Sequence, residues 1–384
     1  MITQKDIAKS LGISQPAVGA VLGRHSENSS THVGPKLRDR ILMRAKEFGY
    51  RPNMFAQGMR GQSTGVIGAL HFSSFLQSSI QREIHMAQAI AARGHKLVTT
   101  DAIASSLNHA SGDESFRLLV DQMIDFRVDG VILSSVPGLM PAEEIARLTG
   151  SGIPCVSMSG IPFPGVPFVG PDFQQGVEIL TQHVIRQGHR HLVMIVQELF
   201  TDSRNPTSLS INPRLKGYSA AVEREGGRVV FLNELEDSGK PGIRQVLTGE
   251  SGPTGWVFSA PGSMNVEDTY IMGYQAVNKL LDAGISADVI LLPNDNWLQG
   301  ALLALKERCI PVPDEVGLTG FDASPFGQYG SLPFTTVAQP HEKIASKAVE
   351  ILFSLMEGEP PPDPMVVRLP CSMVPGATTA PRKS

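Results

Sequence analysis

Apolar positions along the first fifty residues recur every three or four residues, the spacing at which a helix buries one face. They form three runs separated by glycine or proline. The apolar members are Ile7, Ala8 and Leu11, then Val18 and Leu22, and finally Leu37, Ile41, Ala45 and Phe48. This periodicity predicts three short helices packed around one small core.

Residues that begin and end helices stand where this pattern needs them. Thr3 and Asp6 form a capping pair that opens the first helix, and Gly12 ends it. Ser14 is placed to cap the second helix, and Pro16 falls in its first turn, where a missing N–H costs nothing. The proline therefore begins this helix rather than breaking it.

The third helix is predicted to open at Gly34 and Pro35 and to end at Gly49. Its polar face carries five cations, which are Lys36, Arg38, Arg40, Arg44 and Lys46. Two short helices joined by a glycine turn and followed by a basic helix indicate a helix-turn-helix unit. A small helical bundle with a solvated charged face fits the same pattern.

Charge is divided unequally along the chain. The whole sequence contains 33 Lys and Arg against 37 Asp and Glu, a net charge of −4. Residues 1–63 contain ten basic and four acidic side chains, so this segment carries +6 and the remainder −10. Because phosphate contacts supply most of the affinity for nucleic acid, only this leading segment is expected to meet DNA.

From Gly65 onward, short apolar runs alternate with helical stretches. The first series has runs at 65–70, 95–100, 130–135 and 153–158, with helices at 78–93 and 113–126. The second series has runs at 191–196, 228–233, 289–292 and 316–322, with a helix from Leu215. Such alternation predicts parallel sheets with helices on both faces, and two series predict two lobes.

The remaining composition narrows the function class. The chain has 384 residues, of which 41% are hydrophobic, enough for two or three compact units. Three separated cysteines, a charged N-terminus and the lack of a membrane-length apolar run lead us to expect an intracellular protein with no membrane contact. No phosphate loop, nucleophile elbow or dinucleotide fingerprint occurs, so we predict no catalytic residue and no cofactor. His189 and His191 suggest a metal site, but they are expected to begin a strand, and we predict no metal.

Several stretches resemble the lactose/galactose repressor family of bacterial transcription regulators. They are "ITQKDIAKSLGISQPAVGAVLG", "VGPKLRDRILMRAKEFGYRPNMFAQGMRGQSTGVIG", "RVDGVIL", "GIPCVSM", "RQGHRHLVMI", "PRLKGYSAA", "NDNWLQGALLALKE", "VPDEVGLTGFD" and "LPFTTVAQP". The matches run in order over nearly the full length. They are specific for the family and not for any one member.

The resemblance implies a fold and a division of the chain. We expect an all-α helix-turn-helix DNA-binding domain at 1–50, a hinge at 51–63, and an α/β two-lobed periplasmic-binding-protein-like domain at 64–384. In the family the chain crosses between the lobes three times, and we place the crossings near Gly188, Asp322 and Val337. Lobe 1 would then comprise 64–188 and 323–337, and lobe 2 would comprise 189–322 and 338–384.

The resemblance also implies that the second helix enters the major groove of DNA. Gln15, Pro16 and Ala20 stand where base contacts are made, although the family often has arginine at the last position. Gln15 is thus the strong base-reading candidate. Candidate DNA contacts are Thr3, Gln4, Ser14, Gln15, Pro16, Ala17, Ala20, Arg24, Lys36, Arg38, Asn53, Ala56 and Met59.

In the family the hinge becomes helical on the operator and wedges an apolar side chain into the minor groove. Met59 stands at that place, and apolar wedges of this kind kink DNA. An ordinary apolar linker residue is the other interpretation of Met59.

Candidate ligand contacts follow predicted strands, because ligands bind at the carboxyl ends of parallel strands. These residues are Ser74, Phe75, Asn294, Asp295 and Asp322. The resemblance adds effector contacts at Asp172, Arg214 and Gln339, and it supports Asn294 and Asp322. Each alone also fits a turn residue or a surface ion pair. Trp256 and Trp297 fit either a sugar-stacking platform or the core. The chain is longer than is usual for the family between Arg214 and Asn294; we place the excess within 234–270, where "PGSMNVEDTY" has loop composition.

These observations predict a dimeric regulator that binds a double-stranded operator and responds to a small effector, a sugar or related metabolite. An enzyme and a transport-associated solute-binding protein are the alternatives. Loss of residues 1–63 would abolish DNA binding in the regulator and cost either alternative little.

Overall fold

The computed structural model describes residues 2–22, 33–50, 63–71, 77–101, 112–134, 141–158, 162–197, 212–231, 252–260 and 266–382. The chain divides into two compact units, Met1–Gly65 and Val66–Ser384. Each unit is considered by itself. Of the predicted DNA contacts, Arg24, Asn53, Ala56 and Met59 lie outside the described residues, as do the predicted ligand contacts Ser74 and Phe75.

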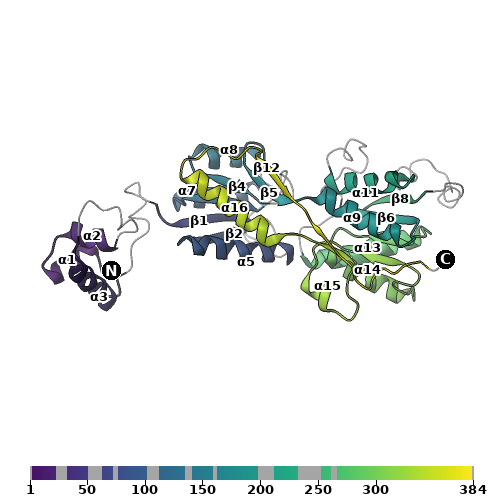
Figure 1. Ribbon diagram of the computed structural model, residues 1–384, viewed down its shortest axis with the longest axis horizontal. Coiled ribbons are helices and arrows are strands. Elements are labelled where there is room, and N and C mark those ends of the chain that lie inside the picture. Colours follow the sequence, from purple (N-terminus) through teal and green to yellow (C-terminus); the bar gives the residue numbers. More distant parts are fainter. Residues whose placement is uncertain are drawn as a thin grey trace. The chain divides into compact units, whose positions relative to one another are not determined.

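The N-terminal unit consists of α1 (Gln4–Leu11), α2 (Gln15–Leu22) and α3 (Pro35–Glu47) (Figure 1). One apolar cluster joins the three helices. Its buried members are Ile7, Ala8, Val18, Val21, Ile41 and Ala45. The periodicity of the sequence therefore predicted both the helices and most of their shared core.

The helix ends follow the local signals in the sequence. The Thr3 hydroxyl accepts a hydrogen bond from the Asp6 amide at 3.3 Å, and Asp6 accepts the Thr3 amide at 2.8 Å, which completes the capping box. Gly12 ends α1 with a φ of 68°, a left-handed conformation that glycine adopts without strain. Ser14 Oγ accepts the Ala17 amide at 3.4 Å. Both predicted caps are confirmed.

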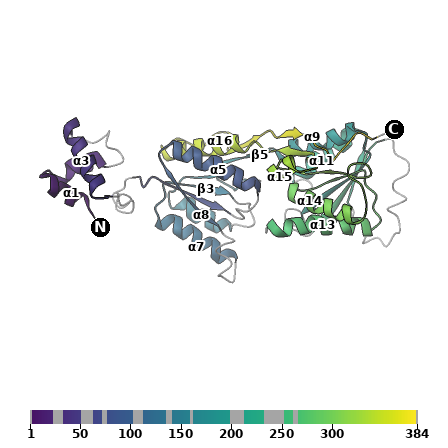
Figure 2. The same cartoon turned by 90° about the horizontal axis from the view of Figure 1, so that it is seen from below.

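The first lobe of the second unit is a parallel six-stranded sheet in the order β12-β5-β4-β3-β1-β2. Its strands are β1 (Val66–His71), β2 (Lys96–Asp101), β3 (Gly130–Ser134), β4 (Cys155–Ser157), β5 (Phe168–Pro171) and β12 (Val366–Leu369). Its helices are α5 (Gln77–Ala92), α7 (Gly112–Asp125), α8 (Ala142–Gly150) and α16 (His341–Met356). Figure 2 shows α5 and α16 on one face of this sheet and α7 and α8 on the other.

The second lobe is a parallel five-stranded sheet in the order β10-β9-β6-β8-β7. Its strands are β6 (His191–Gln197), β7 (Arg228–Phe231), β8 (Thr254–Ala260), β9 (Val289–Leu291) and β10 (Gly317–Thr319). Its helices are α9 (Phe173–Arg186), α11 (Pro213–Arg224), α13 (Val266–Asp282) and α14 (Asp295–Glu307). The predicted fold class, a helical head followed by two parallel α/β lobes, is confirmed.

Both faces of the second sheet are buried, which explains why its strands are apolar throughout. Along β6, Leu192 and Met194 pack with the cluster that includes Leu215 of α11. The alternate residues Val193 and Ile195 pack with the cluster formed by α13 and α14. The alternation of side chains across a strand thus supplies one apolar surface to each helical layer.

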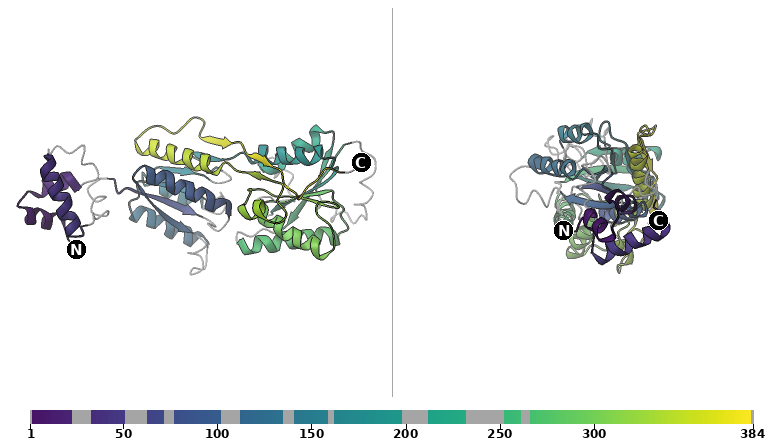
Figure 3. Two further views of the ribbon diagram at one scale, coloured as in Figure 1. Left: turned by 60° about the horizontal axis from the view of Figure 1, so that its bottom comes forward. Right: turned by 90° about the vertical axis from the view of Figure 1, so that its left-hand side faces the viewer.

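The structure corrects the predicted lobe boundaries. Helix α16 packs against α5 and the strands β3, β4 and β5, and β12 pairs with β5, so 341–369 belongs to the first lobe (Figure 3). Helix α9 packs against α11, so the chain has entered the second lobe by Phe173, well before Gly188. The crossings therefore fall near Asp172, Gln339 and Pro370. The prediction failed because lobe membership depends on packing partners that are distant in sequence.

The last two crossings run beside each other. β11 (Thr336–Ala338) pairs antiparallel with β13 (Ser372–Val374), and the short helix α15 (Pro325–Tyr329) precedes β11 in the chain. The C-terminal segment returns to the second lobe, where Thr378 Oγ1 donates to the Leu318 carbonyl at 2.7 Å.

The loop predicted at "PGSMNVEDTY", residues 261–270, is partly corrected, because α13 begins at Val266. Earlier in the segment with excess length, residues 254–260 form the sheet strand β8. Residues 232–251 and 261–265 lie outside the described residues. Within the described ranges, no helix is both long enough and apolar enough to cross a membrane.

Candidate functional site

The first turn of α2 presents polar surface at the N-terminal unit. Gln15 and Pro16 are exposed, whereas Val18 is fully buried in the helical core and holds the helix in place. Ala20 is only 8% exposed. Its burial counts against the predicted base contact, because a methyl group turned toward the interior cannot reach a base edge. Gln15 remains the base-reading candidate on this helix.

Cations surround the start of α3. Lys36 and Arg38 are exposed in its first turns, close to the helix N-terminus, where amide dipoles favour an anion. Arg44 forms an ion pair with Glu47 at 3.3 Å and lies 5.4 Å from the centre of the Phe48 ring. Lys36 and Arg38 are therefore better placed than Arg44 to bind phosphate. Thr3 is exposed, Gln4 is half-buried, and the Thr3 hydroxyl is occupied by its helix cap.

In the second unit, Arg214 lies at the beginning of α11 and is held from three sides. Its Nη1 donates to the Pro293 carbonyl at 3.0 Å. The guanidinium carbon lies 4.3 Å from the centre of the Phe173 ring and 4.2 Å from that of Phe321. Burial lowers the pKa of Arg214, and the negative charge of Asp322 acts in the opposite direction. Two aromatic rings and a nearby carboxylate thus orient one cation.

Asp322, Gln339 and Arg82 form a polar chain that joins the two lobes. Gln339 Nε2 donates to Asp322 Oδ1 at 2.5 Å, and Arg82 Nη1 of α5 donates to Gln339 Oε1 at 3.3 Å. Asp322 has a φ of 113°, a strained conformation for a residue with a side chain, and its amide donates to the Val337 carbonyl at 2.8 Å. The charge of this carboxylate acts on both Arg82 and Arg214.

Asp295 is corrected from ligand contact to structural residue. It is 1% exposed, and its carboxylate accepts hydrogen bonds from the Ser324 amide at 2.6 Å, the Ser324 hydroxyl at 2.8 Å and the Thr336 hydroxyl at 2.7 Å. Burial, and secondarily the charge of Asp322, raise the pKa of Asp295 to about 7. Its bonding capacity ties the segment after β10 to β11, so it has no free face for an effector.

The other predicted contacts divide between helix caps and core. Asn294 caps α14 by accepting the Trp297 amide at 3.1 Å, and Asp172 caps α9 by accepting the Gln175 amide at 3.0 Å. Both remain half-buried and keep polar atoms for a ligand. Trp256 and Trp297 are 1% and 0% exposed within one apolar cluster, so both belong to the core and not to a stacking platform.

Three residues of this site were missed from the sequence. Phe173 and Phe321 each stand next to a predicted contact, and this adjacency is a signal that could have found them. Arg82 gave no local signal, because an arginine within a helix is usually exposed. Its partner Gln339 is 257 positions away in the chain.

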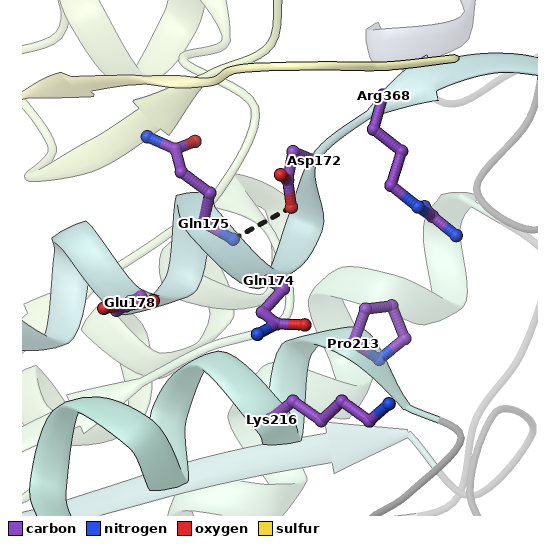
Figure 4. A pocket seen from close by; sticks show the side chains of 7 residues that line it. All are labelled: Asp172, Gln174, Gln175, Glu178, Pro213, Lys216 and Arg368. Carbon is purple, nitrogen blue, oxygen red and sulfur yellow. Dashed lines mark hydrogen bonds between the residues drawn. The ribbon is translucent and has the colours of Figure 1, made fainter. Parts of the chain in front are cut away.

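A separate pocket of about 470 Å³ lies beside the first crossing (Figure 4). Its lining residues are Asp172, Gln174, Gln175, Glu178, Pro213, Lys216 and Arg368. Lys216 extends from α11 and Arg368 from β12, with Pro213 between them. Asp172 thus borders this pocket. Burial raises the pKa of the nearby Cys371 thiol to about 12; the charge of Arg214 acts in the opposite direction, and the charges of Asp172 and Asp322 add to the rise.

Known proteins share both the sequence pattern and the fold. The sequence profile of the periplasmic binding protein-like domain matches residues 181–379, more than half of the chain. The ribose operon repressor of Escherichia coli K12 is 24% identical over 356 residues, covering 92% of each chain. Catabolite control protein A of Priestia megaterium is 25% identical over 373 residues, covering 96% of each. The chain belongs to the lactose/galactose repressor family.

Solved structures have the same fold as this family member. A lac repressor dimer bound to operator and the anti-inducer ONPF superposes with a TM-score of 0.72 at 20% identity, covering 99% of both chains. A complex of the transcriptional regulator CelR with cellobiose gives a TM-score of 0.60 at 22% identity, covering 98% of this chain and 100% of that one. The shared fold includes the helical head as well as the two lobes.

Proposed function

We propose that this chain is a sequence-specific DNA-binding transcription regulator, acting as a homodimeric repressor whose operator affinity is set by a small effector. The proposal includes the absence of enzymatic activity and a cytoplasmic location on the bacterial nucleoid. Family membership supports the class of regulator, because the named relatives include the ribose operon repressor. The lac repressor dimer bound to operator supports the manner of DNA binding.

The observation that carries this proposal is that one small unit exposes both the start of α2 and the cations of α3. Gln15 and Pro16 face outward at a helix start that is fixed from beneath by Val18 and Ile7. A glutamine side chain can bind adenine through two hydrogen bonds, and Lys36 and Arg38 are exposed for phosphate contacts. One small unit therefore supplies both base reading and positioning on the DNA backbone.

The effector site is proposed at Arg214, Asp322 and Gln339, with Asn294 and Asp172 at its border. A sugar or related metabolite offers hydroxyl groups that both donate to a carboxylate and accept from an arginine or an amide. Gln339 lies on a crossing between lobes, so a ligand that binds it acts on the segment connecting them. Different lobe arrangements with and without effector would then give different operator affinities.

Exposed apolar side chains support the proposed dimer. Ile80 and Ile84 stand one turn apart on α5 and are 44% and 51% exposed. Ile271 on α13 and Leu303 on α14 are 51% and 50% exposed. The exposed pair on α5 is the kind of apolar surface that another subunit can cover.

The test is selection of operator sequences by the full-length protein from a random duplex pool, followed by fluorescence anisotropy with the selected site. We expect a near-palindromic site with half-sites one helical turn apart or a multiple of that distance, because the dimer would present two identical heads. The charge-reversed variant Lys36→Glu/Arg38→Glu is the control and should not bind. Failure of the unaltered protein to bind any duplex at low ionic strength would overturn the proposal.

A further inference from the structure

Arg82 is a buried cation whose positive charge has no carboxylate bound to it among the described residues. It lies on α5 and is 8% exposed. Its hydrogen bond to Gln339 Oε1 is made to a neutral amide, and its buried Nε has no partner in the described part of the chain. Burial lowers the pKa of Arg82, while the charges of Asp322 and Glu83 act in the opposite direction. A buried guanidinium normally has a carboxylate or phosphate bound to it directly.

The carboxylates nearest to Arg82 have other partners. Asp322 Oδ1 accepts the hydrogen bond from Gln339 at 2.5 Å. Glu83, the next residue on α5, lies 3.1 Å from His71 Nδ1, at the end of β1. Within the described ranges, neither of these carboxylates forms an ion pair with Arg82. Its charge is therefore balanced only at a distance.

His341 adds unused hydrogen-bonding groups beside Gln339, whose carbonyl accepts the His341 amide at 2.9 Å. It is the first residue of α16, and both of its ring nitrogens are buried without a partner among the described residues. Burial, together with the charges of Arg82 and His85, lowers the pKa of His341 to about 3. The imidazole is thus neutral near pH 7 and offers one N–H donor. The start of the 16-residue helix α16 is also a position at which anions are favoured.

We propose that Arg82 and His341, beside Gln339, form a subsite for an anionic group on the effector, either a carboxylate or a phosphate. An anionic oxygen can accept from the guanidinium and the imidazole and can neutralise the buried charge. A hydroxyl group of a neutral sugar can accept a hydrogen bond but leaves that charge uncompensated. The inference rests on the proposed function and narrows its effector from sugars in general to sugar acids or sugar phosphates.

The position of the subsite gives the anion a part in connecting the lobes. Arg82 belongs to the first lobe and Arg214 to the second, and the charge of Asp322 acts on both. An effector with its hydroxyl groups at Arg214 and its anionic end at Arg82 would bind to both lobes at once. Neutral sugars would bind to the second lobe alone and would have less effect on the operator complex.

The first experiment measures the subsite with inorganic phosphate as the probe. The full-length protein and the variants Arg82→Gln, Arg82→Lys and Arg117→Gln are melted in phosphate and in chloride at equal ionic strength. Arg117 is an exposed arginine on α7 and is the matched control. We expect phosphate to raise the melting temperature of the unaltered protein and of Arg117→Gln, with a smaller rise for Arg82→Lys and none for Arg82→Gln.

Without phosphate, Arg82→Gln should be at least as stable as the unaltered protein, because it removes an unpaired buried charge. Equal phosphate effects on the unaltered protein and Arg82→Gln would overturn the proposal.

The second experiment identifies the source of the anion. Glucose, gluconate and glucose 6-phosphate share one carbon skeleton, and each is titrated into the operator complex, as are the corresponding ribose compounds. We expect the sugar acid or the sugar phosphate to release the operator. Arg82→Gln should need about ten times or more of this effector than the unaltered protein does for the same release. Release by the neutral sugar at equal concentrations in both proteins would overturn the anion subsite while leaving the regulator intact. Absence of operator binding would instead overturn the proposed function, and the phosphate melts would still decide the subsite.

Discussion

Individual residues in this protein take their roles from their surroundings more than from their chemical type. Asp295 and Asp322 are both aspartates that follow or precede elements of the second lobe. Asp295 is enclosed by three donors and serves the fold, whereas Asp322 is half-buried and its charge acts on both Arg82 and Arg214. Gln15 and Ala20 differ in the same way, since one faces outward from α2 and the other is buried.

The role of Gln15 is open to a direct measurement. We expect Gln15→Ala to relax the base preference at one position of each half-site, at a cost of about 1–3 kcal/mol on the preferred operator. Arg38→Ala is the matched comparison, because loss of a phosphate contact weakens binding to all sequences alike and lowers the salt slope by about one. Repeating the operator selection with both variants checks this. An unchanged consensus for Gln15→Ala would show that α2 is not the reading helix.

The raised pKa of Asp295 predicts a dependence of stability on pH. Its pKa is about 7 in the fold against an ordinary 3.8, so the folded protein binds the proton more tightly than the unfolded chain. The free energy of unfolding of the second lobe should therefore fall as the pH rises from about 4 to about 7, by at most about 1.4 kcal/mol for each step of one in pH. Asp295→Asn should flatten this slope, even though it replaces one acceptor oxygen by a donor.

Tryptophan fluorescence during urea unfolding measures the free energy of unfolding of the second lobe at each pH. The chain has two tryptophans, Trp256 and Trp297, and both lie in the core of the second lobe. Asp282→Asn is the control, because Asp282 is an exposed partner of Arg308. A slope that persists unchanged in Asp295→Asn would assign the pH dependence to another group.

Helices of the second lobe approach each other at glycines. A Cβ on Gly217 of α11 would lie 2.1 Å from the Gln174 carbonyl oxygen of α9. A Cβ on Gly300 of α14 would lie 1.9 Å from the Tyr270 carbonyl oxygen of α13. These contacts are with backbone atoms, so a larger residue would push the helices apart. Gly19 of α2 is different, since its Cβ would have Gln4 Oε1 at an ordinary 3.5 Å.

A pair of Gly→Ala variants tests this difference between elements. Gly217→Ala should destabilise the second lobe by about 2–3 kcal/mol, because overpacking displaces the α9 backbone. Gly19→Ala should instead stabilise the N-terminal unit by about 0.5–1 kcal/mol, because alanine favours a helix and has room there. Urea unfolding followed by tryptophan fluorescence checks the first, and amide hydrogen exchange of residues 2–22 checks the second. Equal signs for the two variants would contradict the argument from helix spacing.

Over the whole molecule, the proposed control of DNA binding depends on segments that cross between the lobes. Asp172, Gln339 and Arg368 lie at or beside the three crossings, and two of the crossing strands, β11 and β13, are paired. Side-chain hydrogen bonds from Arg82 to Gln339 and from Gln339 to Asp322 also connect one lobe to the other. An effector that binds these residues therefore acts on the connection between lobes, not on one lobe alone.

Effector response and operator binding should accordingly be separable. Arg214→Ala should leave the operator affinity unchanged and should raise the effector concentration needed for release by roughly ten- to a hundredfold, the loss of one charge-assisted hydrogen bond. Arg224→Ala, at the other end of α11, is the control, because Arg224 forms an ion pair with Glu178 on the surface. Anisotropy with the selected operator and a releasing metabolite measures both quantities. An unaltered response in Arg214→Ala would remove this arginine from the effector site.

The sequence alone determined the elements and the family. The capping pair Thr3–Asp6, the turn at Gly12 and the apolar period of α1 to α3 all depend on neighbours within a few positions, so they can be read from local sequence. The alternation of strands and helices likewise gave the fold class. Asp322 entered through its position after a predicted strand, and Arg214 and Gln339 entered through the family resemblance. In the structure Gln339 donates to Asp322, whose charge acts on Arg214.

Only the tertiary structure decided which lobe α16 and β12 join, that Asp295 and both tryptophans are internal, and that Arg82 contacts Gln339. The physical reason is that these properties depend on burial and on partners distant in sequence, from 29 positions for Asp295 and Ser324 to 257 for Arg82 and Gln339. A parallel sheet places its neighbouring strands far apart along the chain, so local periodicity contains no information about which strand pairs with which. Arg82 and His341, which we propose bind the anionic end of the effector, are likewise far apart in the sequence.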